Sequence, residues 1–403
     1  MSSTSTTVVV GVCGGIAAYK SAELIRSLKS LNFDVHVIPT LNALRFIGEA
    51  TLSALSGNKV MTDVWQEAQD VQHINLAKTA DAIAVYPTTA DFMARLVEGR
   101  SNDLLSATLL SSSAPKILFP AMHTEMWLNP ATQENVRILR ERGYLILNPE
   151  EGKLTSGDSG LGRLCDPLAA TAVISHATTR KDPFDLTGVK ILITAGGTRE
   201  SIDPVRFLSN KSSGKQGFAL ATAASVRGAD VTLISANTTL TVPAGVTFKS
   251  VETSSEMLEA VKVERESHDI VIMAAAISDF TPNEVSIEKI KKTQTPELHL
   301  FLKPTEDILR LLTATATKGQ TIVGFAAETG TNALERGLEK LLKKGCQVAV
   351  VNDVSEGRVF GEETNQVLIG TASGSKETSE RLTKIQIAHL ILDTISQYRL
   401  SGK

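Results

Sequence analysis

Short runs of apolar, β-branched residues alternate with segments of helical period along this chain, and this alternation restricts the fold more than any other feature. The run at 8–12 is followed by Gly14 and Gly15, and apolar residues then recur at helical spacing from Ile16 to Leu31. Further strands are expected at 34–38, 81–86 and 116–119. The pattern is typical of a doubly wound parallel sheet with helices on both faces.

The same pattern begins again near residue 180. The segment 179–183 is polar and ends in proline, as in a linker. It is followed by a strand at 189–193, by Gly196 and Gly197, and by a helix at 215–228. Later strands are expected at 230–234, 269–273, 321–325 and 346–351. The sequence therefore predicts an α/β chain of two three-layer, doubly wound (Rossmann-like) domains, at residues 1–180 and 186–403.

The composition agrees with this fold class and argues against several kinds of function. Aromatic residues are only 4% of the 403 residues, so the core must be built from Val, Ile, Leu and Ala, as in parallel sheets. Lys and Arg number 41 against 44 Asp and Glu, and the net charge of −3 predicts no nucleic-acid partner. Three cysteines without a CxxC pair predict neither disulfides nor a structural zinc site.

The first apolar run is interrupted by glycines at 11, 14 and 15, so it predicts neither a signal peptide nor a membrane span. Together with the cysteine pattern, which is typical of a reducing compartment, this predicts a cytoplasmic protein without a membrane partner.

The glycine turns at 11–15 and 195–198 follow strands, where free backbone N–H groups and a helix dipole can hold an anion. Neither turn is followed by a second strand that ends in a carboxylate, which a dinucleotide site would use to bind a ribose. The sequence thus disfavours a nicotinamide-dependent oxidoreductase and favours a ligand with one terminal phosphate, such as FMN or a nucleotide. Tight helix–sheet packing explains the glycines equally well.

A second group of residues, Pro87, Thr88, Thr89 and Ala90, ends a strand and opens a helix. Ligands of open α/β sheets bind at this carboxyl edge. One threonine could serve only as a helix N-cap. The two groups together favour an anion site in the first domain.

Many segments of the chain, in order, resemble one family. In the first half these are GGIAAYK at 14–20, QHINL at 72–76, PTTAD at 87–91 and PAMHTEMW at 120–127. They resemble the FMN-dependent phosphopantothenoylcysteine decarboxylases. In the second half, the segments that resemble the phosphopantothenate–cysteine ligases are TAGGTRE at 194–200, DPVR at 203–206, SNKSSGK at 209–215, AAA at 274–276, KIKK at 289–292, GFAAE at 324–328 and VNDV at 351–354. The chain is similar to bifunctional enzymes of coenzyme A biosynthesis.

For the first half, the resemblance implies a flavin-decarboxylase type of domain and an FMN site made of Gly14, Gly15, Ile16, Ala17, Thr40, Pro87, Thr88, Thr89 and Ala90. His73 matches the active-site histidine of the family, although by itself it could be an ordinary histidine at a helix start. His123 stands where many relatives have an asparagine, and Ser156 stands where the substrate flap usually has a cysteine. A serine is a poorer proton donor than a thiol, so the alternative is an active ligase fused to a silent FMN-binding half.

For the second half, the resemblance implies that CTP activates 4'-phosphopantothenate as an acyl-cytidylate, which cysteine then attacks. Asn210 would hold the intermediate, Lys289 would stabilise charge, and Arg206 would pair with a substrate phosphate or carboxylate. The remaining nucleotide or substrate contacts implied are Gly196, Gly197, Met273, Ala274, Ala275, Asp279, Asp307, Ile308, Phe325, Lys340 and Lys344. Mg²⁺ would travel with CTP, since no carboxylate cage is visible and no metal ligand is predicted.

The resemblance also implies a homo-oligomer, with trimeric contacts in the first half, dimeric contacts in the second and possibly a dodecamer.

Overall fold

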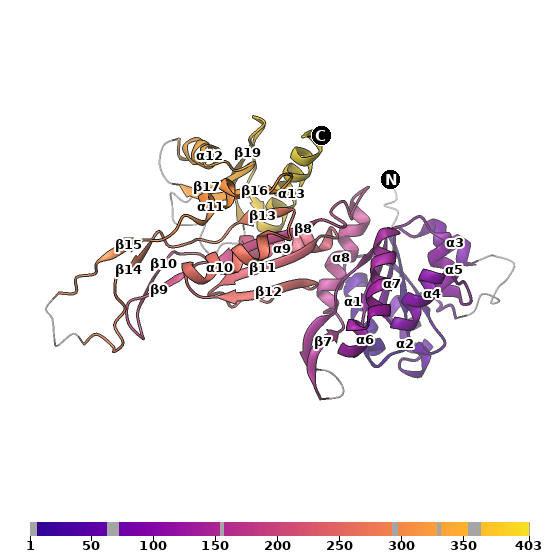
Figure 1. Cartoon of the computed structure of the whole chain (residues 1–403). Helices are drawn as coiled ribbons and strands as arrows, with labels where there is room; N and C mark the ends of the chain where they lie inside the picture. The colour runs from indigo at the N-terminus through magenta and orange to yellow at the C-terminus, as the bar shows by residue number, and fades with distance from the viewer. Residues whose placement is uncertain are drawn as a thin grey trace. The chain divides into compact units, whose positions relative to one another are not determined.

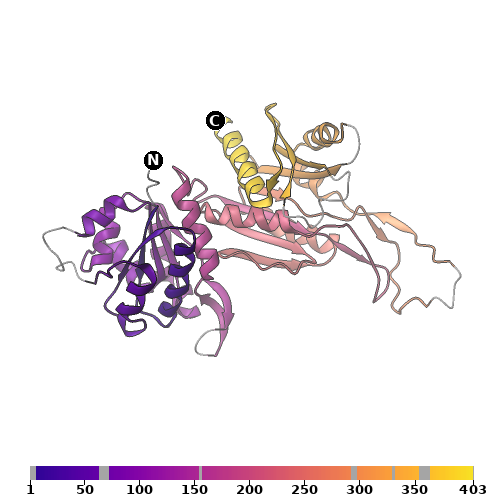
Figure 2. The ribbon, with the colours of Figure 1, turned by 180° about the vertical axis from the view of Figure 1, so that it is seen from behind.

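The computed structural model describes residues 6–62, 72–153, 157–291, 297–328, 332–353 and 364–402. The chain divides into two compact units, residues 1–188 with 225–228 and residues 189–224 with 229–403. In Figures 1 and 2 the first unit runs from indigo to magenta, and most of the second runs from pink to yellow.

The first unit is built on a parallel sheet in the order β2-β1-β3-β4-β5. Its strands are β1 (Thr7–Val12), β2 (Asp34–Pro39), β3 (Ala82–Thr88), β4 (Lys116–Pro120) and β5 (Tyr144–Ile146). The two central strands, β1 and β3, are almost wholly buried because their Val, Ile and Ala side chains face helices on both sides. This is the strand order of the flavodoxin-like fold. The predicted doubly wound sheet is confirmed.

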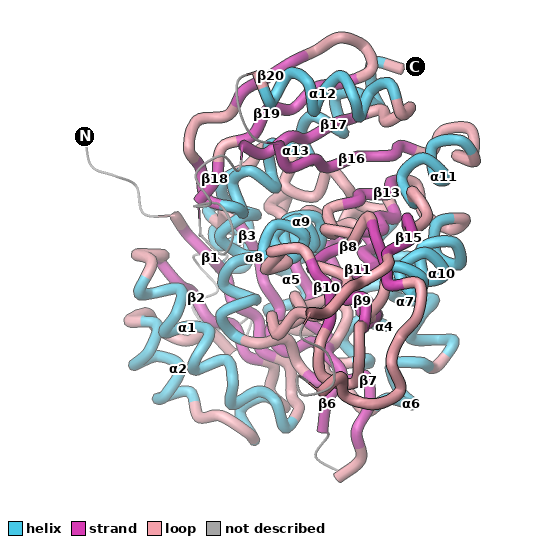
Figure 3. The backbone as a smooth tube through the Cα atoms, turned by 90° about the vertical axis from the view of Figure 1, so that its left-hand side faces the viewer, coloured by secondary structure: helices cyan, strands magenta, loops and turns pink. Residues whose placement is uncertain are grey.

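Helices cover both faces of this sheet (Figure 3). On one face α1 packs against α2 and α8, and a core on the other face joins α3, α4, α5 and α7 to the sheet. A short hairpin, β6 (Glu150–Lys153) with β7 (Ser159–Arg163), follows the last strand. The helices are η1 (Ile16–Lys20), α1 (Ser21–Ser30), η2 (Ala43–Arg45), α2 (Glu49–Ser56), α3 (Gln72–Thr79), α4 (Ala90–Glu98), α5 (Leu104–Ser111), α6 (Thr124–Leu128), α7 (Pro130–Glu141) and α8 (Pro167–Thr179).

The second unit has a sheet in the order β12-β11-β8-β13-β16-β17-β19-β20. The first six strands are parallel and, numbered within the unit, follow the Rossmann order 3-2-1-4-5-6, while β19 and β20 are antiparallel. The strands are β8 (Lys190–Gly196), β11 (Asp230–Ala236), β12 (Val246–Val251), β13 (Ile270–Met273), β16 (Thr321–Glu328), β17 (Val348–Asp353), β19 (Val367–Thr371) and β20 (Lys376–Thr378). The Rossmann-like prediction for this half is confirmed.

Three features of this sheet differ from the sequence-based expectation, and the first is that β12 was not predicted. The antiparallel pair β19 and β20 was not predicted. The strand expected at 346–351 begins instead at Val348, because Gly345 has a φ of +96° and the Cys346 N–H still bonds back to Leu341 O at the end of α12.

The helices of the second unit are α9 (Lys215–Val226), α10 (Ser254–Arg265), α11 (Ile308–Ala314), α12 (Ala333–Lys343) and α13 (Lys384–Ser401). Thr383 is the N-cap of α13 and forms a capping box with Gln386. Three small ribbons complete the unit: β9 (Arg199–Ser201) with β10 (Phe207–Ser209), β14 (Phe280–Pro282) with β15 (Leu302–Pro304), and β18 (Thr364–Asn365) with β21 (Leu382–Thr383). Among the described residues, every helix is too short or too polar to span a lipid bilayer.

Candidate active sites

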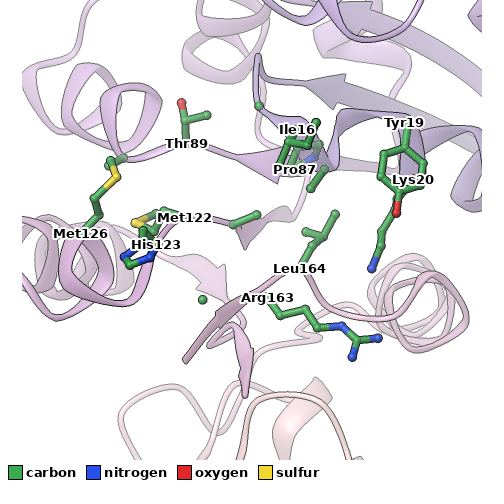
Figure 4. Close-up of a pocket in the computed structure, with 15 residues that line it drawn as sticks. Ile16, Tyr19, Lys20, Pro87, Thr89, Met122, His123, Met126, Arg163 and Leu164 are labelled. Carbon is green, nitrogen blue, oxygen red and sulfur yellow. The ribbon is translucent and has the colours of Figure 1, made fainter. Parts of the chain in front are cut away.

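A cavity of about 610 Å³ lies at the carboxyl end of β1 and β3 in the first unit (Figure 4). These two strands are the topological switch point of the order β2-β1-β3-β4-β5, where ligands of this fold bind. The wall of the cavity is formed by η1, the start of α4, the segment 121–126 and the end of β7. The pocket volume falls within the roughly 300–1,000 Å³ of small-molecule sites.

The glycine turn after β1 has two separate tasks. The Cys13 N–H donates to Pro87 O at 3.1 Å, which ties the ends of β1 and β3 together. A Cβ at Gly14 would lie 2.4 Å from Asn42 Cβ, so this glycine permits close packing of the next loop. A Cβ at Gly15 would meet only Thr89 Cγ2, at 3.9 Å. Gly15 therefore faces the cavity, whereas Gly14 serves the packing role that the sequence left open.

The start of α4 forms the second predicted part of the site. Thr89 is its N-cap and accepts the Phe92 N–H at 3.3 Å. The hydroxyl of Thr88 is buried and donates to Val85 O at 2.8 Å, and Thr40 accepts the Ala43 N–H at 3.3 Å. Of the nine residues predicted to bind FMN, six line the cavity: Gly15, Ile16, Ala17, Pro87, Thr89 and Ala90. Gly14, Thr40 and Thr88 are described but are not part of its lining.

The residues around the cavity fit a flavin mononucleotide. Ile16, Met122 and Leu164 supply apolar surface for a flat ring system. The first N–H groups of α4 have no partner within the helix and suit a phosphate. Figure 4 shows Lys20 and Arg163 on one side of the cavity, which adds two cations for anionic groups. Neither cation was predicted to line the site: Lys20 ends η1, shortly after the glycine turn, and Arg163 ends β7, which is distant in the chain.

His123 lies on the opposite side of the cavity, beside Met122 and Met126. Its Nδ1 is hydrogen-bonded to the Glu125 carboxylate, which only accepts, so Nδ1 carries the proton. The backbone N–H of Glu125 and the ring of His123 both lower the pKa of the Glu125 carboxyl group. The other ring nitrogen, Nε2, lies 3.9 Å from the Asp158 carboxylate. The imidazole is thus held between two carboxylates at the cavity wall.

The other two catalytic predictions of this half fall at the edge of the described chain. His73 is the second residue of α3, but its side chain lies outside the described part, as does Ser156. All three cysteines of the chain are buried. Burial raises the pKa of Cys13 and of Cys346 to about 12 and raises the pKa of Cys165 as well. The native fold therefore offers no accessible thiolate to replace the missing flap cysteine.

A cavity of about 150 Å³ lies in the second unit, where β13, β16 and β17 end beside the start of α9. Three predicted residues, Ala274, Ala275 and Phe325, line it. A Cβ at Gly217 would lie 2.5 Å from Ala195 Cβ, so this glycine lets α9 begin close against β8. The cavity also has polar lining residues that were not predicted as site residues: Ser212, Ser213, Lys215, Asn352, Asn365 and Lys384. A Ser-Ser-Gly run directly before a helix was the available signal.

A second cavity, of about 470 Å³, brings together Gly197 and Asn210 with Arg199, Lys211 and other residues. The Asn210 Nδ2 donates to Ile277 O at 3.0 Å. Gly196 has a φ of +80°, and a Cβ there would lie 1.9 Å from Ala236 O. The Gly197 N–H donates to the same oxygen at 3.2 Å. The glycine pair thus packs against β11, and the Gly197 N–H already has a backbone partner.

The structure brings some of the other predicted nucleotide residues together. Asp307 is the N-cap of α11 and accepts a hydrogen bond from Lys344 Nζ at 2.6 Å. Burial opposes ionisation of Asp307, but Lys344 and the Arg310 N–H outweigh it and lower the pKa of this carboxyl. Lys340 Nζ lies 3.9 Å from Glu328. Met273 and Ile308 are buried, and so are packed rather than presented to a ligand.

Nine predicted residues of this unit are absent from the linings of both described cavities: Gly196, Arg206, Met273, Asp279, Lys289, Asp307, Ile308, Lys340 and Lys344. Asp279 and Lys289 are exposed, and Arg206 pairs with Asp203 at 3.2 Å. Among the described residues there is also no cluster of three or more His, Cys, Asp or Glu side chains placed to hold a metal ion.

Comparisons with known proteins cover nearly the whole chain. The model of a family described as Flavoprotein matches residues 1–178, and that of the DNA/pantothenate metabolism flavoprotein C-terminal domain matches residues 186–398. The coenzyme A biosynthesis bifunctional protein CoaBC of Mycolicibacterium smegmatis is 44% identical over 402 residues, 97% of either chain. The protein of the same name from Haemophilus influenzae is 40% identical, over 97% of this chain and 98% of its own. A crystal structure of the C-terminal domain of a CoaBC protein is 38% identical, covers 55% of this chain and all of that chain, and has a TM-score of 0.46.

Proposed function

This chain belongs to the bifunctional CoaBC family of coenzyme A biosynthesis, and on that premise we propose how its two units share the chemistry. The second unit joins 4'-phosphopantothenate to cysteine with CTP, and the first unit decarboxylates the product with FMN. The cavity at the switch point of β1 and β3 carries the proposal for the first unit, because its volume, apolar walls and helix N-terminus fit this cofactor. A silent first half is not favoured, because the relatives are named bifunctional.

In the decarboxylation, FMN supplies a two-electron oxidation of the cysteinyl thiol and later returns the electrons. The residues of the chain bind and orient the substrate. In its protonated form, the His123 ring donates from Nε2 to the substrate carboxylate, the task of an amide in many relatives. The Glu125 carboxylate holds the ring through Nδ1. His73, in the family motif at 72–76, is the proposed proton acceptor.

In the ligation, the carboxylate of 4'-phosphopantothenate attacks the α-phosphate of CTP and pyrophosphate leaves. The amine of cysteine then attacks the acyl-cytidylate and releases CMP. Asn210 holds the acyl-cytidylate, and Lys289 stabilises the negative charge that develops. In this proposal Lys340, Lys344 and the Asp307 N-cap meet the triphosphate, and the Lys344–Asp307 hydrogen bond supports their acting together. The serines and N–H groups before α9 suit a terminal phosphate.

Three finer features are part of the same proposal. Mg²⁺ binds with CTP through phosphate oxygens, because the described residues include no carboxylate cage. The enzyme acts as a homo-oligomer, as the family resemblance implies. Three free, buried cysteines support a cytoplasmic location.

The test measures the activity of each half separately, with the purified full-length chain. We expect a yellow protein with an FMN spectrum that releases carbon dioxide from phosphopantothenoylcysteine. From CTP, cysteine and 4'-phosphopantothenate, mass spectrometry should find the dipeptide-like product with CMP and pyrophosphate. An FMN-loaded protein that releases no carbon dioxide would leave only the ligase, with the first half as a binding scaffold.

A further inference from the structure

The turn between β9 and β10 contains a nearly fully buried carboxylate, that of Asp203, with an exposed fraction of 2%. Its Oδ1 accepts the N–H groups of Val205 and Arg206, at 2.8 and 2.7 Å, and these two bonds shape the turn. The second carboxylate oxygen, Oδ2, is not needed to shape the turn. That oxygen accepts hydrogen bonds from the Arg206 guanidinium and, outside the ribbon, from the Ile290 N–H, both at 3.2 Å.

The partner of Oδ2 directly follows Lys289 in the chain. The Arg206 Nη1 also donates to Ile290 O at 3.2 Å, so the Asp203–Arg206 pair holds both backbone polar groups of Ile290. A second tie lies a few residues earlier, where the Ser286 N–H donates to Ile202 O at 3.0 Å. The β9–β10 ribbon therefore fixes the main chain on both sides of an exposed lysine.

The Asp203 carboxyl group favours its ionised form, which is the form that best accepts these four hydrogen bonds. Burial opposes ionisation, but the N–H groups of Val205, Arg206 and Ile290 and the guanidinium of Arg206 outweigh it and lower the pKa of Asp203. An ionised acceptor makes stronger hydrogen bonds than a neutral one. Arg206, predicted from the family to meet a substrate anion, has a carboxylate partner within its own ribbon.

We propose that Asp203, together with Arg206, is a positioning residue of the ligation: it anchors Ile290 and thereby sets where the ammonium of Lys289 can act. A lysine side chain is long and flexible, so the position of its Cα limits where its charge stabilises a leaving group or an attacking amine. This inference rests on the proposed role of Lys289 and adds to it the device that holds that lysine in place.

The direct test measures the anchoring without measuring activity. Trypsin cleaves after lysine, and cleavage of the Lys289–Ile290 bond in the native full-length chain requires Ile290 to leave its anchor. We expect Asp203→Ala to raise the rate of cleavage at this bond by about tenfold, because proteolysis follows the population of the locally open form. Mass spectrometry of the fragments separates this bond from neighbouring lysine sites. An unchanged rate at this bond contradicts the proposal.

A matched control lies in the same ribbon. Glu200 is also a buried carboxylate, 4% exposed, but it accepts the N–H of Ser254, at the start of α10. We expect Glu200→Gln to leave cleavage after Lys289 within about twofold of the parent chain, because the Ile290 anchor is intact. Equal acceleration by both variants would mean general loosening of the ribbon and would overturn the specific role of Asp203.

A kinetic test asks whether Asp203 acts through Lys289. We expect Asp203→Ala to lower kcat of ligation about tenfold or more, with carbon dioxide release by the first unit as an internal control. In the double variant with Lys289→Gln, ligation should be no slower than in Lys289→Gln alone, to within about twofold. Multiplicative losses would contradict a positioning role.

Two further outcomes keep the proposals separate. If Lys289→Gln ligates at the parental rate, the catalytic role of Lys289 fails, while the trypsin result still decides the anchoring. If Asp203→Ala does not fold, Asp203→Asn carries the same tests with smaller effects, because the amide keeps an acceptor oxygen and loses the charge.

Discussion

Two neighbouring carboxylates hold the imidazole ring of His123 in place. Nδ1 is committed to Glu125, and Nε2 lies 3.9 Å from Asp158 at the cavity wall. Nε2 is the nitrogen that we propose meets the substrate carboxylate, and a side-chain amide can present a donor in much the same direction. On this proposal, the position needs a hydrogen-bond donor at a fixed place rather than an imidazole as such.

The first prediction follows from this geometry. We expect His123→Ala to lower carbon dioxide release by about 10²–10³, the usual cost of one positioned donor, and His123→Asn to lose much less. Glu125→Gln should have a small effect, because solvent screens an ion pair whose carboxylate is this exposed. Steady-state assays with phosphopantothenoylcysteine measure all three. An inactive His123→Asn with bound FMN would show that the ring itself is required.

At the scale of single residues, the sequence could predict site residues that lie in one local motif, but not contacts between distant segments. Gly15, Pro87 and Thr89 line the cavity because strand, turn and helix start are consecutive in the chain. Arg206 shows the limit, because its partner Ile290 is 84 residues away and no spacing rule brings them together. Arg163, at the end of β7, reaches the cavity from a distant part of the chain, whereas Lys20 ends η1 directly after the glycine turn.

At the scale of elements, the β6–β7 hairpin is held against the segment before α6 by two glycines. The Met122 N–H donates to Gly162 O at 3.1 Å, and a Cβ at Gly162 would lie 2.1 Å from Met122 O. A Cβ at Gly160 would lie 2.4 Å from the Thr124 hydroxyl. The absence of side chains lets the hairpin lie on this segment, which brings Asp158 near His123.

We therefore expect Gly162→Val to impair decarboxylation strongly, by about tenfold or more, because the backbone oxygen of Met122 cannot move aside as a side chain would. Ligation by the same chain should be unchanged. Gly48→Ala is the control, since a Cβ there meets nothing within 4 Å and Gly48 has an ordinary φ of −74°. Parental carbon dioxide release by Gly162→Val would mean that the hairpin's docking is irrelevant to catalysis.

The elements themselves could be predicted better than their arrangement. Runs of Val and Ile located most strands of both sheets, but the orders of the strands depend on pairings between distant segments. Strand β20 was missed because it is only three residues, all exposed, and has no apolar alternation to identify it. Strand β19 was also missed, although its buried apolar run, VLIGT, is a strand signal of the same kind as those that were used.

At the scale of the whole molecule, each described cavity is lined by residues of one unit, and each unit has its own apolar core. The two proposed reactions therefore share a chain without sharing described side chains. The product of the ligation is the substrate of the decarboxylation, so one defective half should not disable the other.

Complementation tests this separation. We expect Lys289→Gln to decarboxylate supplied phosphopantothenoylcysteine at the parental rate, and His123→Ala to ligate at the parental rate. A mixture of the two variants should convert CTP, cysteine and 4'-phosphopantothenate to 4'-phosphopantetheine, because the intermediate can diffuse between molecules. Failure of the mixture with both single activities intact would point to direct transfer within one assembly.

The burial of every sulfhydryl group in this protein has a pharmacological consequence. Cys13, Cys165 and Cys346 are each at most 2% exposed, and electrophiles such as maleimides or acrylamides react with accessible thiolates. Covalent warheads that require a cysteine would find no accessible thiolate in the native molecule, so an inhibitor would bind reversibly or react with another nucleophile, such as a lysine.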